Sequence, residues 1–159
     1  MKIKTGIGQD SHKHNFLGQN KELVLGGVVF RNELPLHGNS DSDVVLHSIT
    51  NAVSGITGVN ILGKIADEMC KSGIVDSEEY LLKAMESLNG FKITHVSISI
   101  ECKQPAITPY IPQMKKSIAG ILSLETSDVG ITATSGEELT EFGKNKGIQV
   151  FSIVTAIKE

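Results

Sequence analysis

The chain has no tryptophan, and aromatic residues make up only 4% of it. This scarcity disfavours a nucleic-acid surface, on which bases would stack against aromatic rings. The net charge of −3 gives the protein as a whole no electrostatic attraction for nucleic acid. The apolar runs are far shorter than a membrane span, and the N-terminal residues lack the apolar region of a signal peptide. We therefore expect neither a nucleic-acid partner nor a membrane, and look for a small-molecule function.

Cysteine is also scarce. Cys70 and Cys102 are the only two, too few for a disulfide framework, and a reduced, cytoplasmic setting is the simplest expectation. The 159 residues are 40% hydrophobic and show no linker or internal repeat. They are enough for one domain with its own core, so we expect a single domain over residues 1–159.

Strand and helix patterns alternate along the chain. Alternating or continuous apolar residues predict strands over 2–10, 94–100, 129–134 and 147–157, and an extended segment with a Gly-Gly kink or hairpin over 22–30. Helical spacing predicts helices over 42–57, 64–71, 77–88 and 109–122, the first capped by Ser40 or Asp41. A capping-box pattern at Ser135 predicts a further short helix that ends at Gly143. This order favours an α/β or α+β fold with helices on one face of the sheet.

Asp10 and His12 are the most informative residues. Residues two apart on a strand point to the same face, so one metal ion can contact both side chains. His47 lies in a helical pattern and is a candidate third ligand. Two histidines and one carboxylate suit zinc, and three protein ligands leave a fourth position open for chemistry. The alternative is a chance Asp-x-His pair with a structural helix histidine; His14 lies on the same alternation and is a weaker candidate.

Three further segments suit a phosphorylated ligand. Residues 39–43, Asn-Ser-Asp-Ser-Asp, precede the helix that carries His47, and free N–H groups at a helix N-terminus bind anions. Simple helix capping is the alternative. Residues 132–137 and 142–144 place hydroxyls, a turn glycine, a carboxylate and a lysine close together, a set suited to diphosphate and a hard cation such as Mg²⁺. The alternative for Glu137 is a favourable interaction with the helix dipole.

The last of these segments is a proline-punctuated loop, residues 102–109, which follows the strand over 94–100. Loops at strand ends often carry binding residues, and an ordinary strand-to-helix turn is the alternative.

Together these segments resemble the 2-C-methyl-D-erythritol 2,4-cyclodiphosphate synthase family nearly from end to end. Residues 8–12 are similar to its Gly-x-Asp-x-His metal strand, and residues 25–28 to its Gly-Gly-Val turn. Residues 40–47 resemble its Ser-Asp-Gly-Asp-x-x-x-His helix start, with Ser42 in place of glycine. Residues 105–114 resemble its cytidine-binding loop and the helix that follows, and residues 134–148 its diphosphate-binding segment.

The resemblance implies a small subunit with a four-stranded mixed sheet that assembles as a homotrimer, with active sites between subunits. It implies a metal-dependent phosphorus–oxygen lyase of non-mevalonate isoprenoid precursor biosynthesis. The family converts 4-diphosphocytidyl-2-C-methyl-D-erythritol 2-phosphate to the cyclic diphosphate and releases CMP.

Site roles also follow from the resemblance. Asp10, His12 and His47 would hold Zn²⁺, and Glu137 a second divalent ion, Mg²⁺ or Mn²⁺. Residues with expected catalytic roles are Asn39, Ser40, Ser135 and Glu137. Residues expected to bind substrate are Gly63, Cys102, Lys103, Gln104, Pro105, Ala106, Ile107, Thr134 and Lys144.

The chain departs from the family pattern near the expected substrate pocket. Asn39 replaces a histidine, Asn51 an aspartate, Ile61 an acidic residue, and Lys144 stands where arginine is frequent. An amide cannot accept substrate hydroxyls as a carboxylate does, and each unpaired hydroxyl would cost about 1–3 kcal/mol. Two other readings therefore stay open: a zinc enzyme for another cytidine diphosphate ester, and a trimeric nucleotide- or diphosphate-binding protein without turnover.

Overall fold

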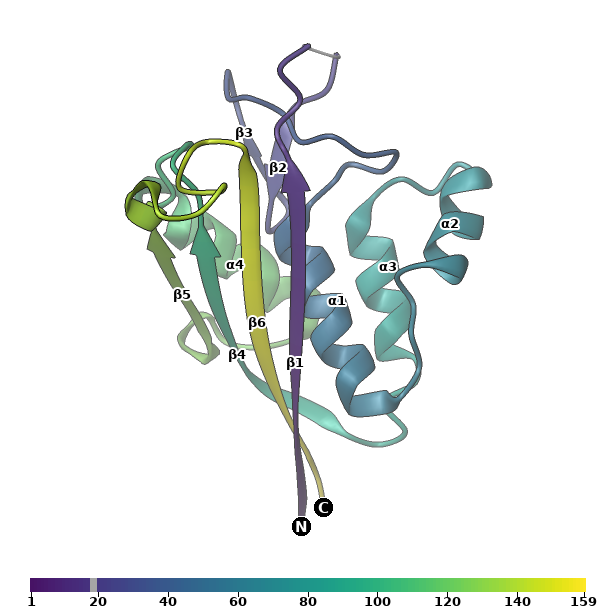
Figure 1. Cartoon of the computed structure of the whole chain (residues 1–159). Helices are drawn as coiled ribbons and strands as arrows, with labels where there is room; N and C mark the ends of the chain where they lie inside the picture. The colour runs from purple at the N-terminus through teal and green to yellow at the C-terminus, as the bar shows by residue number, and fades with distance from the viewer. Residues whose placement is uncertain (18–19) are drawn as a thin grey trace.

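The computed structural model describes residues 1–17 and 20–159. Its centre is a four-stranded sheet in the order β1-β6-β4-β5 (Figure 1). The strands are β1 (Lys2–Lys13), β4 (Lys92–Glu101), β5 (Val129–Thr134) and β6 (Gly147–Lys158). The β4–β5 pair is parallel and the β1–β6 and β4–β6 pairs are antiparallel, so the sheet is mixed as predicted.

The helices lie on one face of this sheet (Figure 1). Helix α1 (Val44–Thr57) packs on β1 and β6, and α4 (Ile111–Leu122) packs on β5. Helix α3 (Ser77–Met85) contacts α1, and α2 (Lys64–Lys71) precedes it. The one-sided arrangement is confirmed. No helix in the described ranges has the length and apolar character needed to cross a membrane.

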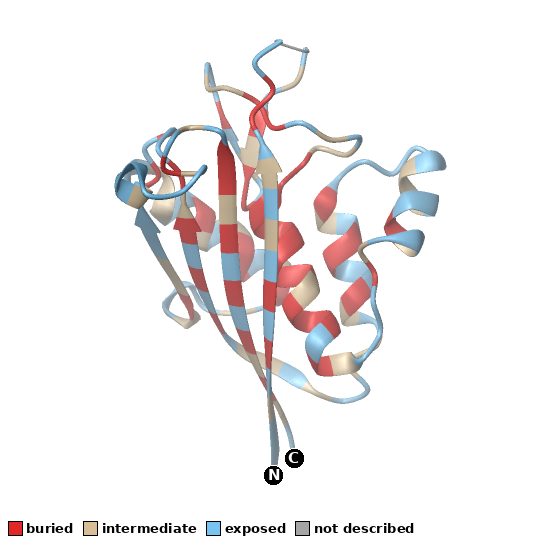
Figure 2. Cartoon of the chain, viewed as in Figure 1, coloured by how far each residue is buried: buried red, intermediate tan, exposed pale blue. Residues whose placement is uncertain are grey.

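The strands alternate between the covered and the open face of the sheet (Figure 2). On β4, Val96, Ile98 and Ile100 are buried toward the helices, and the residues between them are exposed. The open face is not uniformly polar, because Ile7, Phe151 and Ile153 are 66%, 44% and 43% exposed there.

Two glycines set how closely α1 approaches β1. A Cβ built on Gly8 would lie 1.9 Å from the carbonyl oxygen of Ser48, and one on Gly6 would lie 2.0 Å from that of Ala52. Both contacts are far shorter than van der Waals distance, so only glycine fits at these positions. This close packing places α1 directly over the strand that carries Asp10 and His12.

A small hairpin fixes the start of α1. The extended segment predicted over 22–30 forms β2 (Leu23–Leu25) and β3 (Val28–Phe30), joined by Gly26 and Gly27 at φ +60° and +75°. Two positive φ angles in a two-residue loop suit the strand twist and favour glycine. The N–H groups of both glycines donate to the carboxylate of Asp43, at 2.9 and 2.7 Å.

Asp43, and not Ser40 or Asp41, is the N-cap of α1. Its carboxylate also accepts the N–H groups of Val45 and Leu46, at 3.1 and 3.0 Å. Ser42 has φ +58°, a left-handed conformation that cannot continue a right-handed helix. For this reason the helix begins at Val44 and not at 42 as predicted.

Other helix and strand boundaries also differ from the predicted ones. The short helix predicted from Ser135 to Gly143 does not form: a single 3-10 turn, Gly136–Glu138, takes its place, and Glu137 and Glu138 have φ +49° and +61°. Helix α3 ends at Met85, not 88, and the helix predicted from 109 begins as a 3-10 turn, Thr108–Tyr110, before α4. Strand β1 continues to Lys13, beyond the predicted end at 10.

Candidate metal centre and its pocket

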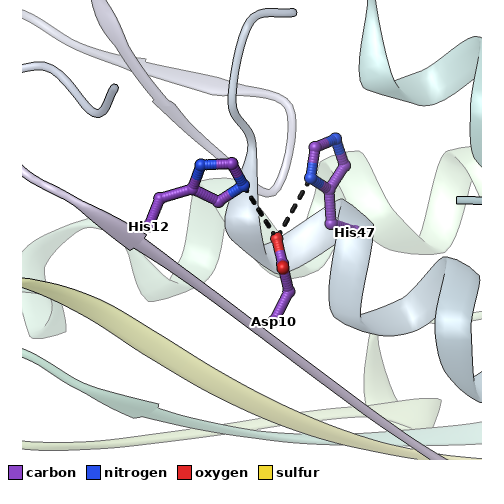
Figure 3. Close-up of side chains that lie close together, drawn as sticks. All are labelled: Asp10, His12 and His47. Carbon is purple, nitrogen blue, oxygen red and sulfur yellow. Dashed lines mark hydrogen bonds and ion pairs between the residues drawn. The ribbon is translucent and has the colours of Figure 1, made fainter. Parts of the chain in front are cut away.

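Three side chains from β1 and α1 converge at one end of the sheet (Figure 3). The Oδ2 atom of Asp10 lies 3.0 Å from Nε2 of His12 and 3.1 Å from Nδ1 of His47. The three candidate ligand atoms lie within 4.8 Å of one another. The predicted set of Asp10, His12 and His47 is therefore a group that could hold a metal ion.

The hydrogen bonds of His12 favour a cation between these residues. Its Nδ1 atom lies 2.8 Å from the carbonyl oxygen of His37. A carbonyl only accepts, so Nδ1 carries the proton and donates it. In the neutral ring the lone pair is then on Nε2, which faces Asp10. Acceptor groups thus face one another, and a shared cation removes their repulsion.

The charges of the triad are strongly coupled. Burial opposes the ionisation of Asp10, but its hydrogen bonds to His12 and His47 outweigh burial and lower the pKa of the carboxyl to about 2. Burial also opposes a charge on His12, but the hydrogen bond and the negative charge of Asp10 prevail and raise the pKa of its imidazole. Asp10 is therefore the ionised, negatively charged member of the triad.

His47 is held from its other side as well. It is only 7% exposed, and its Nε2 atom lies 2.8 Å from the hydroxyl oxygen of Ser77 at the start of α3. The same hydroxyl contacts the carboxylate of Asp41. Strand β1 and helix α1 supply the ligands, while α3 and the loop before α1 support one of them.

The triad lines a pocket together with several other predicted residues. Asn39, Ser40 and Gly63 border it. The other lining residues are Leu62, Ala66, Asp67, Cys70 and Tyr80. The thiol of Cys70 donates to the carbonyl oxygen of Asn39 at 3.4 Å. His14 is not among the lining residues; it is buried where a backbone bridge joins it to Leu36.

The remaining predicted residues form a second cluster at the ends of β4 and β5. The N–H of Cys102 donates to the carbonyl of Thr134 at 3.1 Å, which ties the two predicted segments together. Lys103 pairs with Glu138 at 2.8 Å. None of these residues borders the pocket of the triad, so the structure gathers the predicted site into two separate groups.

Members of the second cluster differ in accessibility. Three of the predicted members are buried: Cys102, Pro105 and Ile107. The others are exposed: Lys103, Gln104, Ala106, Thr134, Ser135, Glu137 and Lys144. The ammonium group of Lys144 lies 3.4 Å from Glu141. Burial and the negative charge of Glu101 raise the pKa of the Cys102 thiol to about 12, so this sulfur is neutral. The Cys102 side chain is a packing group.

Two departures from the family pattern have structural roles in this chain. The amide of Asn51 donates to the carbonyl oxygen of Gln9 at 3.0 Å and does not border the pocket. Ile61 is 2% exposed and belongs to the hydrophobic core. Neither side chain is placed to bind a pocket ligand in this conformation.

Sequence reasoning missed several residues around the triad. The carbonyl of His37, the hydroxyl of Ser77 and the carboxylate of Asp41 support the two histidines. Tyr80 and Cys70 line the pocket. In the sequence, Asp41 belongs to the segment 39–43 before a predicted helix, and Ser77 is the first residue of another predicted helix. No spacing rule in the sequence connects either residue to His47.

Comparisons with known proteins agree with this geometry. A model of the YgbB family matches residues 3–157. A 2-C-methyl-D-erythritol 2,4-cyclodiphosphate synthase of Chlamydia trachomatis serovar L2 is 43% identical over 157 residues, which cover 98% of this chain and 88% of that protein. The protein of the same name from Chlamydia muridarum is 45% identical, with the same coverage.

Solved structures show the same fold. The bifunctional IspDF of Campylobacter jejuni matches with a TM-score of 0.87 and 30% identity, covering 98% of this chain and 42% of that longer one. The Plasmodium falciparum IspF complex with CDP matches with a TM-score of 0.83 and 27% identity, covering 99% of this chain and 97% of that one.

Proposed function

This chain belongs to the YgbB family of 2-C-methyl-D-erythritol 2,4-cyclodiphosphate synthases, and we propose that it performs the family's cyclisation. In that reaction an oxygen of the substrate's 2-phosphate attacks the β-phosphorus of the diphosphocytidyl group. A new P–O–P bond closes the ring, the bond from the β-phosphorus to the bridging oxygen breaks, and CMP leaves with that oxygen. The protein is a metal-dependent phosphorus–oxygen lyase of isoprenoid precursor biosynthesis.

The convergence of Asp10, His12 and His47 is the observation that carries the proposal. The donor set fits zinc, and three protein ligands leave a position for a substrate oxygen. When bound, zinc supplies positive charge that polarises the attacked phosphate. The chain's part is to hold two neutral imidazoles and one carboxylate in place. His12 is held by the His37 carbonyl, and the low pKa of Asp10 keeps that ligand ionised.

In this proposal Asn39 and Ser40, which line the pocket of the triad, orient a phosphate. The Ser40 oxygen accepts the N–H of Ser42 at 3.0 Å, which directs the oxygen inward to the loop and leaves its own O–H as a donor. Phosphoryl transfer depends mainly on positioning and on charge neutralisation, so donors fixed by a rigid loop are sufficient. Asn39 offers amide N–H groups where the family has histidine.

The second cluster supplies the cytidine and diphosphate contacts in this proposal. The backbone of residues 102–107 recognises cytosine, Thr134 and Ser135 bind phosphate oxygens, and Lys144 adds positive charge. Glu137 holds a second divalent ion, Mg²⁺ or Mn²⁺; it is exposed and its carboxylate has no ion-pair partner among the described residues. Support comes from the Plasmodium falciparum relative, whose structure is a complex with CDP.

A homotrimer unites the two clusters in this proposal. Within one chain two members of the triad lie on the edge strand β1 and the third on α1. The second cluster lies at the ends of β4 and β5, away from the pocket of the triad. A neighbouring copy that brings its second cluster beside the triad would complete the site. The exposed apolar residues Ile7, Phe151 and Ile153 on the open face of the sheet give copies of the chain a surface to bury against one another.

Phosphorus NMR tests the activity directly. The protein is incubated with Zn²⁺, Mg²⁺ and 4-diphosphocytidyl-2-C-methyl-D-erythritol 2-phosphate, with His47→Ala as the matched control. We expect signals of CMP and of the cyclic diphosphate, absent in the control. An unchanged substrate spectrum with folded, zinc-loaded protein would refute the proposed reaction. A cytidine-nucleotide binding screen would then distinguish a zinc enzyme for another cytidine diphosphate ester from a nucleotide-binding protein without turnover.

A further inference from the structure

We propose that Ser77 is a positioning residue that, together with Asp41, fixes the tautomer of His47, with the proton on Nε2 and the lone pair on Nδ1 toward the metal centre. The inference deepens the proposed function, because it concerns the support of the proposed zinc ligands. It depends on one chain of contacts that joins the loop before α1 to α3 and to the imidazole.

The contacts determine where each proton lies. The hydroxyl of Ser77 contacts Oδ1 of Asp41, and the backbone N–H of Ser77 donates to Oδ2 of Asp41 at 3.0 Å. In this contact the hydroxyl donates and the carboxyl oxygen accepts, so the single hydroxyl proton of Ser77 is directed to Asp41. The Ser77 oxygen then offers only lone pairs to its other neighbour. That neighbour is Nε2 of His47, at 2.8 Å.

The imidazole must therefore donate through Nε2. A neutral imidazole carries one N–H, so the lone pair of His47 is on Nδ1. Nδ1 is the atom that lies 3.1 Å from Asp10. The contact with Ser77 thus selects the tautomer whose lone pair points into the triad, as outer contacts of metal-binding histidines commonly do.

Asp41 is itself held rigidly, which makes it a suitable anchor. Its Oδ1 also accepts the N–H of Asp43 at 3.0 Å, and its own N–H donates to the carbonyl of Val75 at 2.9 Å. These bonds connect the loop before α1 to the segment before α3. The anchor lies next to Ser40, which borders the pocket, so one short loop holds both the pocket wall and the support of His47.

The Ser77 hydroxyl is not needed to form α3. The N-cap of that helix is Asp76, whose carboxylate accepts the N–H of Glu78 at 2.9 Å. The bond from the backbone of Ser77 to Asp41 also survives removal of the hydroxyl. Ser77→Ala should therefore leave the helix in place and remove only the two contacts of the hydroxyl, with His47 and with Oδ1 of Asp41.

The test compares Ser77→Ala and Ser77→Thr with the unmodified protein. Long-range ¹H–¹⁵N NMR reports the tautomer of His47 in metal-free protein, and titration with Zn²⁺ reports affinity. We expect the Nε2–H tautomer in the unmodified protein and a mixture in Ser77→Ala, with zinc affinity reduced on the order of 10- to 100-fold. Ser77→Thr retains a hydroxyl and should restore both readouts.

Ser48→Ala is the matched control. Ser48 is equally buried, but its hydroxyl bonds to the carbonyl of Val45 and the hydroxyl of Ser152, and not to His47. It should leave the tautomer unchanged. An unaltered tautomer and zinc affinity in Ser77→Ala would overturn the inference. Absence of zinc binding by the unmodified protein would overturn the metal site instead, while the NMR tautomer would still decide the role of Ser77.

Discussion

Replacing Gly8 by alanine should move His47, on α1, away from Asp10 and His12, on β1. The new Cβ would lie 1.9 Å from the carbonyl oxygen of Ser48, 2.4 Å from the backbone nitrogen of Ala52 and 3.0 Å from the carbonyl carbon of Asn51. All three atoms belong to the backbone of α1, so no side-chain rotation relieves the clash. Ordinary contact begins at 3.4 Å, and α1 must therefore retreat from β1 by about 1.5 Å.

Such a movement has two measurable consequences. Overpacking of a core costs about 1–3 kcal/mol and occasionally more, and the loss of contact along α1 places this substitution at or above about 3 kcal/mol. For a chain of this size that corresponds to a fall of roughly 6–12 °C in Tm. His47 moves with α1 while Asp10 stays on β1, and metal ligands tolerate errors of only about 0.2 Å.

Thermal unfolding and zinc titration of Gly8→Ala measure both effects. Gly120→Ala is the matched control: Gly120 lies within α4, and a Cβ there meets nothing within 4 Å. Because alanine favours a helix over glycine by up to about 1 kcal/mol, the control should keep or raise Tm. If Gly8→Ala retained the Tm and the zinc affinity of the unmodified protein, the close approach of α1 to β1 would not be what assembles the triad.

Three further outcomes are expected. Asp43→Ala removes a helix cap worth about 0.5–2 kcal/mol and leaves the N–H groups of Gly26 and Gly27 unpaired, at about 1–3 kcal/mol each; urea unfolding should show a loss of at least about 3 kcal/mol, and a loss below 1 would contradict the capping role. Cys102, neutral at a pKa of about 12, should resist iodoacetamide at pH 8 in folded protein and react in denaturant; rapid labelling of the folded state would disprove its burial. The raised pKa of His12 keeps a proton that zinc must displace, so zinc affinity should fall by about tenfold per pH unit below that pKa; an affinity independent of pH between 5 and 8 would exclude His12 as a ligand.

The regular elements of this fold were predictable because their side-chain periods are simple. Strand β5 has the predicted bounds, 129–134, and so does α2, 64–71. The triad was predictable for the same reason. Asp10 and His12 lie two apart on a regular strand, and His47 faces that strand from a helix with a clear apolar stripe.

Irregular backbone explains the errors. Ser42, in the loop before α1, has a left-handed backbone conformation. Its hydroxyl accepts a hydrogen bond from the ammonium of Lys21 at 2.7 Å, and the two residues are 21 apart in the sequence. Propensity does not predict such a conformation for serine. The same holds for Glu137 and Glu138, which have left-handed backbone angles. A tight turn therefore forms there in place of the short helix that the capping-box pattern predicted.

Asn51 shows why resemblance alone could not assign the pocket. Strand β1 is at the edge of the sheet, and its outward carbonyl groups lack a strand partner. The amide of Asn51 donates to one of them, that of Gln9, and so attaches α1 to the edge strand at the residue before Asp10. An ionised aspartate at this position could not donate this bond. The contacts of Ser77 with His47 and of Asn51 with Gln9 join segments that are distant in sequence, and only the folded chain reveals them.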